Sequence, residues 1–146
     1  MSNVYSFLTI NASIVGPGGS FSLANGAAAA EEGITIEAAT EIGTMQIGAD
    51  GLGQHTLHAD KSGKLTVHLL KTSPVNQLLQ ALYNFQTAAS SAYGQNTIVL
   101  NDAARGDVIT AIQCGFAKAP NLTYAKEAGM NAWEFNCIRI ERLLGT

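Results

Sequence analysis

The sequence is poor in charged residues and lacks clusters of basic residues. Only 13% of its 146 residues are charged, whereas 47% are hydrophobic, so a folded monomer would expose an unusually neutral surface. Interfaces between subunits are depleted in charge, and the composition therefore favours a chain that assembles with copies of itself. The net charge of −3 argues against a protein that grips phosphate groups, because such proteins carry a clustered basic face.

Targeting signals and long apolar runs are also missing. No stretch approaches the roughly 18 apolar residues of a membrane-spanning helix, and residues 1–11 show neither the basic start nor the apolar run of a secretory signal. We therefore expect Cys114 and Cys137 to be small buried hydrophobes, with a disulfide between neighbouring strands as the alternative. The length predicts a single domain, residues 1–146, that buries its own core.

Residues that could carry catalysis or bind a metal are present but poorly spaced. His55, His58 and His68 lie close in the sequence, yet no carboxylate or cysteine stands at ligand spacing beside them. No serine lies in a nucleophile-elbow sequence. The acidic residues between positions 31 and 41 indicate a solvated strand edge. We therefore predict no enzyme, no cofactor and no metal site.

Alternating apolar and polar residues predict a mainly β (α+β) chain, a β-sandwich or partial barrel of about eight strands with one flanking helix. Outside the hairpin described below, strands are expected at residues 5–15, from 21, 33–37, 97–100, 107–116 and 132–144, and a loop with one helical turn at 25–32. One face of the strand at 107–116 is expected to carry Val108, Thr110, Ile112, Cys114 and Phe116. The last strand is apolar on both faces, so it is either covered on both sides or reversed by a bulge.

The flanking helix is amphipathic and is expected at about residues 74–92. Ser73 is its expected N-cap and Pro74 its first residue, where a missing N–H does no harm. The other side of the helix carries neutral amides rather than Lys and Glu, which indicates that this side is covered too. Gly94 is expected to end the helix. The apolar stripe facing the core is Val75, Leu78, Leu79, Leu82, Phe85 and Ala89.

Residues 54–70 predict one long hairpin with its turn at Asp60–Lys64 and Gly63 in the left-handed conformation. A slip of one residue would set apolar side chains opposite polar ones, so pattern and turn agree on one register. The register pairs Leu57 with Val67 and His55 with Leu69 on an apolar face, and His58 with Thr66 and Thr56 with His68 on a polar face.

The glycine-rich segment before this hairpin predicts a flexible contact loop. Residues 40–54 make a long excursion for a small domain, and long loops are usually functional or disordered. The segment Gly48–Gly53 lacks the helix N-terminus that completes a phosphate-binding loop.

Short segments distributed over most of the chain carry a family resemblance. They are Gly33–Glu37, Thr44–Gly51, Ser62–Val67, Leu70–Asn76, Gly94–Thr97, Arg105–Asp107 and Leu122–Lys126. In this order and spacing they resemble the tail tube proteins of contractile-tailed bacteriophages.

The resemblance implies a structural subunit whose hexameric rings stack into a hollow tube inside a contractile sheath, the conduit for DNA ejection. Its partners would be further copies of itself, the tail sheath protein, and in the lumen the tape-measure protein and then genomic DNA without sequence preference, with no membrane binding. The protein would assemble in the host cytoplasm and act in the virion tail. Expected channel-facing residues are Thr56, His58, Lys64, Thr66 and His68. Expected contacts between rings or subunits are Gly48, Asp50, Gly51, Leu52 and Gly53.

Three alternatives stay open at this stage. The tube of a related injection or secretion machine would use the same protomer without DNA cargo. A monomeric ligand-binding β-sandwich would share the strand pattern but would not assemble, and stoichiometric zinc or iron would revive a metal-dependent enzyme.

Overall fold

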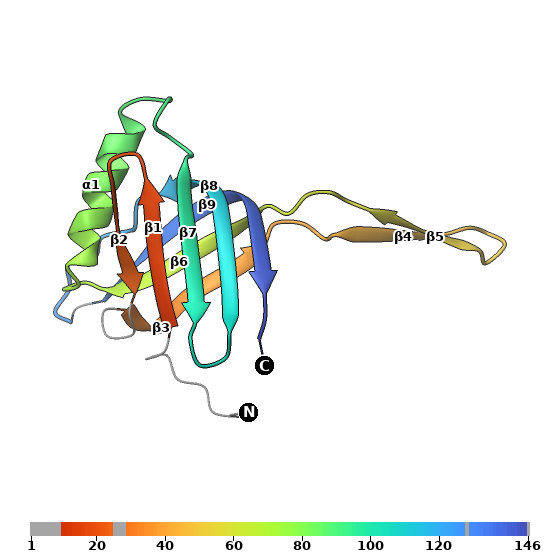
Figure 1. Ribbon diagram of the computed structural model, residues 1–146, viewed down its shortest axis with the longest axis horizontal. Coiled ribbons are helices and arrows are strands. Elements are labelled where there is room, and N and C mark those ends of the chain that lie inside the picture. The colour runs from red at the N-terminus through yellow and green to blue at the C-terminus, as the bar shows by residue number, and fades with distance from the viewer. Residues whose placement is uncertain (1–9, 25–28, 128, 146) are drawn as a thin grey trace.

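The computed structural model describes residues 10–24, 29–127 and 129–145 of the chain (Figure 1). Nine strands and one helix lie in this part. They are β1 Ile10–Gly16, β2 Gly19–Ala24, β3 Ala29–Ala38, β4 Gly43–Ile47, β5 Gly53–Leu57, β6 Gly63–Leu70, α1 Val75–Thr87, β7 Asn96–Asp102, β8 Asp107–Lys118 and β9 Met130–Leu143. The predicted mainly β chain with one helix is confirmed.

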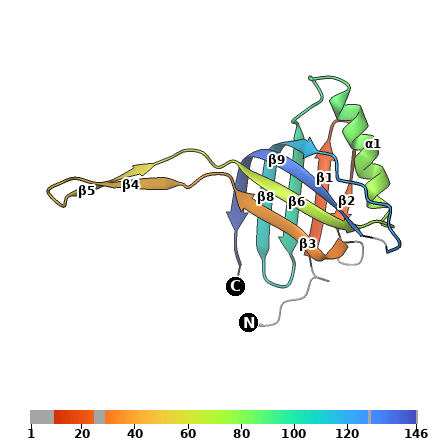
Figure 2. The same ribbon diagram turned by 180° about the vertical axis from the view of Figure 1, so that it is seen from behind.

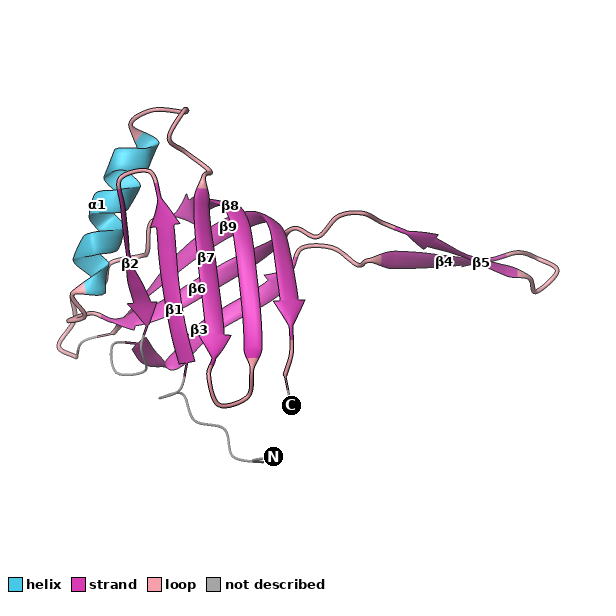
Figure 3. Cartoon of the chain, in the orientation of Figure 1, coloured by secondary structure: helices cyan, strands magenta, loops and turns pink. Residues whose placement is uncertain are grey.

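Seven strands form one antiparallel sheet in the order β2-β1-β7-β8-β9-β6-β3. The sheet curls into a half-barrel in which β2, β1, β7 and β8 make one wall while β6 and β3 cross behind them (Figures 1 and 2). The helix α1 lies at one end of the molecule, and the separate β4–β5 sheet projects from the other (Figure 3). The partial barrel expected from the strand pattern is therefore present.

Alternate residues of the strands point into one hydrophobic core, as the two-residue period of a strand requires. The ring of Phe116 packs against the rings of Tyr83, Trp133 and Phe135, with centroid distances of 5.4, 6.0 and 4.7 Å. Full burial of one such large apolar side chain contributes about 1.5–3 kcal/mol. In β6 the buried hydrophobic side chains are Leu65, Val67 and Leu69.

The helix is shorter than predicted and is only partly covered. It runs from Val75 to Thr87 instead of residues 74–92, and the Val75 N–H lies 3.4 Å from the Ser73 hydroxyl oxygen. Of the predicted stripe, Leu78 and Phe85 are 46% and 55% exposed. The buried residues are Val75, Leu79, Leu82 and Gln86.

The strand β8 changes its inward face near its middle. Gln113 has a φ of +52°, and the pairing of β7 with β8 shifts at this point. As a result Ala111 and Cys114, three residues apart, are both buried. The prediction of one uninterrupted face from Val108 to Phe116 is wrong, because an irregular residue breaks the two-residue period.

The strand β9 makes the same change opposite β8. Cys137 and Ile140 are buried, whereas Ile138 between them is 62% exposed. Of the two explanations for its doubly apolar pattern, the structure shows the reversal of faces.

The strand β3 begins earlier than the sequence pattern indicated. It starts at Ala29, so the predicted loop with a helical turn is wrong for residues 29–32. Residues 25–28, and residues 5–9 of the first predicted strand, lie outside the described residues. The pairing of β3 with β6 shifts between Ala29 and Ile34, and Gly33 has a φ of +64°. This irregularity interrupts the alternation of apolar and polar residues along β3, so the sequence pattern does not show where the strand begins.

Residues 54–70 do not form the predicted hairpin. The strand β5 pairs with β4, while β6 pairs with β3 and β9. The expected turn instead leads from β5 to β6, and Lys61 accepts a backbone hydrogen bond from Ile140 at 2.9 Å. Gly63 lies within β6, where an added Cβ would come within 2.2 Å of the Glu37 carbonyl oxygen. This glycine thus permits close strand approach and does not form a turn.

Candidate assembly surfaces

The β4–β5 hairpin, which we call the arm, has two different faces. One is apolar and carries Met45, Ile47 and Leu57, which are 60%, 59% and 82% exposed, with His55 opposite Met45. An isolated two-stranded hairpin is marginal in water, and an exposed apolar surface usually marks an interaction site. The arm therefore exposes an apolar face of the kind that marks an interaction site. Its other face carries Thr44, Gln46, Gln54 and Thr56.

The glycine-rich segment forms the tip of the arm. The Gly48 N–H donates to the Leu52 carbonyl at 2.7 Å, and the Leu52 N–H donates to Asp50 Oδ1 at 3.1 Å. Gly51 has a φ of +87°, which favours glycine. The predicted excursion over residues 40–54 therefore contains the strand β4 and a bonded turn. The expected contact residues Gly48–Gly53 stand at the end of the arm.

The side of β6 that points away from the core is polar. Lys64, Thr66 and His68 alternate with the buried residues of this strand. Their neighbours include Thr35 and Glu37 on β3, and Glu134 and Asn136 on β9. We call these seven residues the outer polar face. It carries charges of both signs on three adjacent strands.

The five residues predicted to face a channel do not share one surface. Lys64, Thr66 and His68 lie on the outer polar face. Thr56 lies on the polar face of the arm, opposite Thr44, and His58 follows β5, where its N–H donates to Ile42 at 2.7 Å. The predicted pairing of β5 with β6, which placed these residues on one polar face, is wrong, because β5 pairs with β4.

The three histidines are distributed in the same way, on β5, after β5 and on β6. Among the residues that the structure describes, no three His, Cys, Asp or Glu side chains are grouped as a metal site would require.

The base of the arm is held by the carboxylate of Asp60. The Ser62 N–H donates to its Oδ1 at 2.9 Å, and the Thr40 hydroxyl donates to its Oδ2 at 3.0 Å. Hydrogen bonds from Ser62, together with that from Thr40, lower the pKa of Asp60 below its ordinary value. The carboxylate thus bridges the two segments that lead to and from the arm.

One end of the molecule carries no charged side chain in the elements that form it. We call β1, β2 and α1 the uncharged end, since residues 1–30 and 72–101 contain no Asp, Glu, Lys or Arg. All 8 basic and 11 acidic residues lie outside these two stretches. The total charge of the chain does not reveal this surface, whereas the spacing of the charged residues along the sequence does.

Cys114 and Cys137 are free thiols that face one another across β8 and β9. They are direct cross-strand partners, both are buried, and their sulfur atoms are 2.9 Å apart. The hydrogen bond with Cys137 and burial together raise the pKa of Cys114. The expectation of small buried residues is confirmed, and the alternative disulfide is not formed.

Within the described part of the chain, no helix has the length and apolar character needed to cross a membrane.

The curled sheet with one helix is a fold shared with chains in three solved assemblies. A chain in the cryo-electron microscopy structure of the anti-feeding prophage baseplate has a TM-score of 0.61 at 11% identity, covering 98% of this chain and 97% of that one. A chain in the anti-feeding prophage cap has a TM-score of 0.59 at 9% identity, covering 99% of this chain and 94% of that one. A chain in the extended sheath–tube complex of an extracellular contractile injection system, PVC, gives 0.57 at 9%, with coverage of 94% and 89%.

A family model shows to which protein family the chain belongs. The model described as the bacteriophage PhiTE tail tube protein matches residues 1–145. The chain belongs to this family and is a structural subunit of a phage tail tube. The comparison with curated proteins gave no match.

Proposed function

We propose that this subunit forms hexameric rings that stack into a hollow tube inside a contractile sheath, and that the tube conducts DNA at ejection. The observation that carries the proposal is the open curl of the sheet. Within the described residues, β2 and β3 end the sheet and each pairs on one side only. An unpaired edge exposes backbone groups, and pairing edges between subunits removes them when a barrel closes.

The outer polar face supplies the channel wall in this proposal. Its residues Lys64, Thr66 and His68 would face the lumen, with Glu37 and Glu134 on the neighbouring strands. The mixture of signs fits a wall along which DNA slides without being held. Six copies at −3 each give a ring of −18, a field that disfavours retention of phosphate. Thr56 lies on the polar face of the arm and His58 follows β5, so neither residue would line the channel.

The partners follow from this arrangement. The tube would consist of copies of this chain and would contact the tail sheath protein, and in its lumen the tape-measure protein and then the genome. It would assemble in the host cytoplasm and function in the virion tail. The shared fold with a chain of a sheath–tube complex supports the sheath as a partner. The family is structural, which supports a role without catalysis. A related machine without DNA cargo would use the same protomer.

Electron microscopy of purified protein tests the proposal. We expect hollow tubes with sixfold symmetry and β-ladders that run from copy to copy. A monodisperse monomer at high concentration would contradict it. Immunogold labelling of virions along the tail, with DNA release measured on purified receptor or host envelope, distinguishes the phage tube from the tube of an injection machine.

A further inference from the structure

The uncharged end presents an apolar strip on the exposed flank of α1. Leu78 and Phe85 are seven residues apart and lie on the same side of the helix, with the small Ala81 between them. The ring of Phe85 lies against the turn between β1 and β2, because a Cβ at Gly18 would be 2.7 Å from its Cδ1. The strip therefore reaches the turn between β1 and β2, and α1 packs beside β2. A solvated helix normally carries charged residues on its exposed positions, and α1 carries none.

The apolar face of the arm has matching properties. Between Gly43 and Leu57 the only Asp, Glu, Lys or Arg is Asp50 at the tip, so Met45, Ile47 and Leu57 can be covered without desolvating a charge. Covering them with one of the charged surfaces of the molecule would carry a desolvation cost. The two uncharged apolar surfaces are thus suited to each other.

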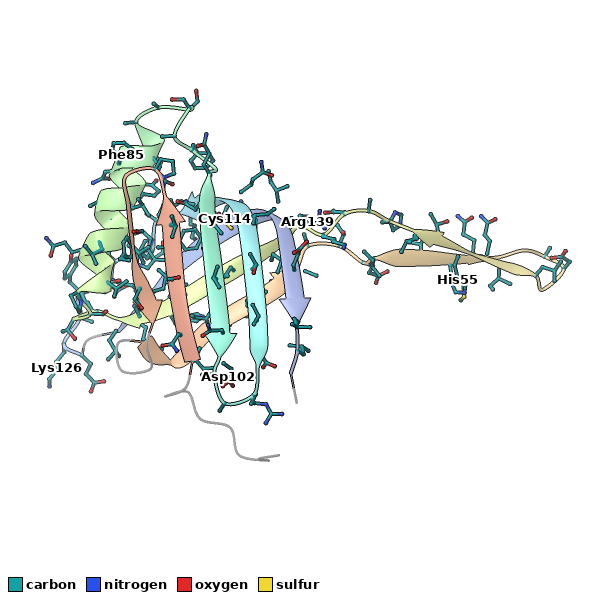
Figure 4. The ribbon with its side chains drawn as sticks, in the orientation of Figure 1. His55, Phe85, Asp102, Cys114, Lys126 and Arg139 are labelled. Atoms are coloured by element: carbon teal, nitrogen blue, oxygen red, sulfur yellow. The ribbon has the colours of Figure 1, made fainter. Side chains whose placement is uncertain are left out.

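The two surfaces lie too far apart to meet within one molecule. Figure 4 shows His55 on the arm and Phe85 on α1 at opposite ends of the chain, and Figures 1 and 2 agree on this placement. A contact between them must join two copies. Because the surfaces differ, the contact is head-to-tail, and head-to-tail contacts propagate into a ring or a filament.

We propose that the apolar face of the arm of one copy docks on the α1 flank and adjoining β2 of a second copy. The inference rests on the proposed function, since it names the surfaces by which tube subunits join. The second copy is the occupant because both surfaces are neutral and apolar, both belong to this chain, and their opposite placement gives every copy one donor and one acceptor.

Paired variants test the docking on the full-length protein. The double variants M45E/I47E on the arm and L78E/F85E on the helix should each weaken self-association by at least about 30-fold, the factor expected when a central interface contact is lost. The controls T44E/Q46E, on the polar face of β4, and Q77E/N84E, on exposed polar positions of α1, add the same charge and should assemble as the wild type does. Circular dichroism verifies the fold of each variant.

A mixture of the two defective variants gives a sharper test. The arm variant retains its acceptor and the helix variant retains its arm, so one docking contact is restored in each mixed pair, and mass photometry should show 1:1 dimers in the mixture that neither variant forms alone. If both variants are folded and their mixture still forms no dimers, the proposal is overturned.

Crosslinking provides a measurement that does not depend on the stability of a variant. A photoreactive phenylalanine in place of Ile47, mixed with an isotope-labelled wild-type copy, should give intermolecular crosslinks to α1 or β2. Crosslinks from position 47 that reach only other elements would overturn the docking. The docking would also be overturned if the same photoreactive residue in place of Phe85, in intact tubes, captured sheath protein. Tubes that form normally from every variant would overturn this inference alone, whereas a wild-type protein that forms no tubes would overturn the proposed function.

Discussion

Gln86 on α1 and Asn96 on β7 exchange two side-chain hydrogen bonds in the buried interior. Gln86 Nε2 donates to Asn96 Oδ1 at 2.6 Å, Asn96 Nδ2 donates to Gln86 Oε1 at 2.8 Å, and both residues are fully buried. Gln86 Nε2 also donates to the Pro17 carbonyl at 3.0 Å. This amide pair fixes the end of α1 to β7 and to the turn between β1 and β2, next to the surface proposed to receive the arm.

Removing one member of the pair should destabilise the fold more than its size indicates. Gln86→Leu or Asn96→Leu leaves a buried amide without its partner, which costs about 1–3 kcal/mol. The double variant Q86L/N96L should cost less than the sum of the two, because no side-chain amide is then left unpaired and only the Pro17 carbonyl loses its donor. Urea unfolding at a concentration where the chain is monomeric measures each free energy of unfolding, since assembly would otherwise add to it. Additive losses would show that the two amides act independently.

The stability contributed by Asp60 should depend on pH in a defined direction. The pKa of Asp60 is lowered in the folded chain, so the folded state favours the carboxylate. Its contribution is therefore present above the ordinary aspartate pKa and is lost as the pH falls through the lowered pKa. The midpoint temperature of thermal unfolding should be lower for Asp60→Ala than for the wild type at pH 7. This difference in midpoint should shrink below about pH 4, near the ordinary aspartate pKa.

Asp60→Asn is the matched control, because its amide oxygen can still accept the Ser62 N–H but does not ionise. Its difference from Asp60→Ala should not change over the same range of pH. A constant gap between wild type and Asp60→Ala down to pH 2 would contradict the assigned role of the carboxylate.

The local patterns of the sequence were better guides than the pairing of strands. The alternation in β6 correctly predicted that Leu65, Val67 and Leu69 share one face, since a buried strand must repeat every two residues. The partner of β5 was wrong because two solutions satisfied the same rule. Pairing with β6 and pairing with β4 both place Leu57 on an apolar face, and only the three-dimensional course of the chain selects between them.

The assembly surfaces show a similar division. The glycine-rich tip was expected at a contact because of its composition, and it does stand at the end of the arm. The exposure of Phe85 could not be read from periodicity, because Gln86, one residue further on, takes the buried position by pairing with Asn96. A polar residue that carries its own partner can displace an apolar one from the core.

The two buried thiols should be inert in the native chain. Both thiols are buried, and the thiolate, which is the reactive form, must reach the reagent. Cys114 donates a hydrogen bond to Cys137, which raises the pKa of Cys114 and lowers that of Cys137, so burial is what protects Cys137. Ellman's reagent at pH 8 should therefore modify neither Cys114 nor Cys137 before unfolding and both afterwards, with a native rate at least about 100-fold below that of a free thiol. Cys114→Ala provides the count for a single thiol. Rapid modification of the folded protein would show that β8 and β9 open locally.

Shortening the tip of the arm should leave the fold intact and weaken assembly. Replacing Gly48–Leu52 by Asn-Gly keeps a two-residue hairpin turn and the pairing of Ile47 with Gly53, while removing Leu52, which is 73% exposed. Circular dichroism and the unfolding midpoint should match the wild type, because the tip contributes nothing to the core. Tube yield by sedimentation should fall, and a Leu52→Ser variant of full length separates loss of the side chain from loss of reach. A normal yield from the shortened arm would exclude the tip from any contact between rings or subunits.

Positive charge on the outer polar face should slow the passage of DNA without preventing assembly. Thr66→Lys with His68→Lys adds about twelve positive charges to a ring of six, at positions that point away from the core, and clustered lysines bind phosphate through release of counterions. Virions carrying this variant should have tails of normal length and a reduced rate of DNA release, with the deficit largest at low salt. Thr66→Ser with His68→Gln changes the same positions without charge and should release DNA at the wild-type rate. If the lysine variant also releases DNA at that rate, at low as well as high salt, then Thr66 and His68 do not line the channel, and the sheet must face the lumen with another surface.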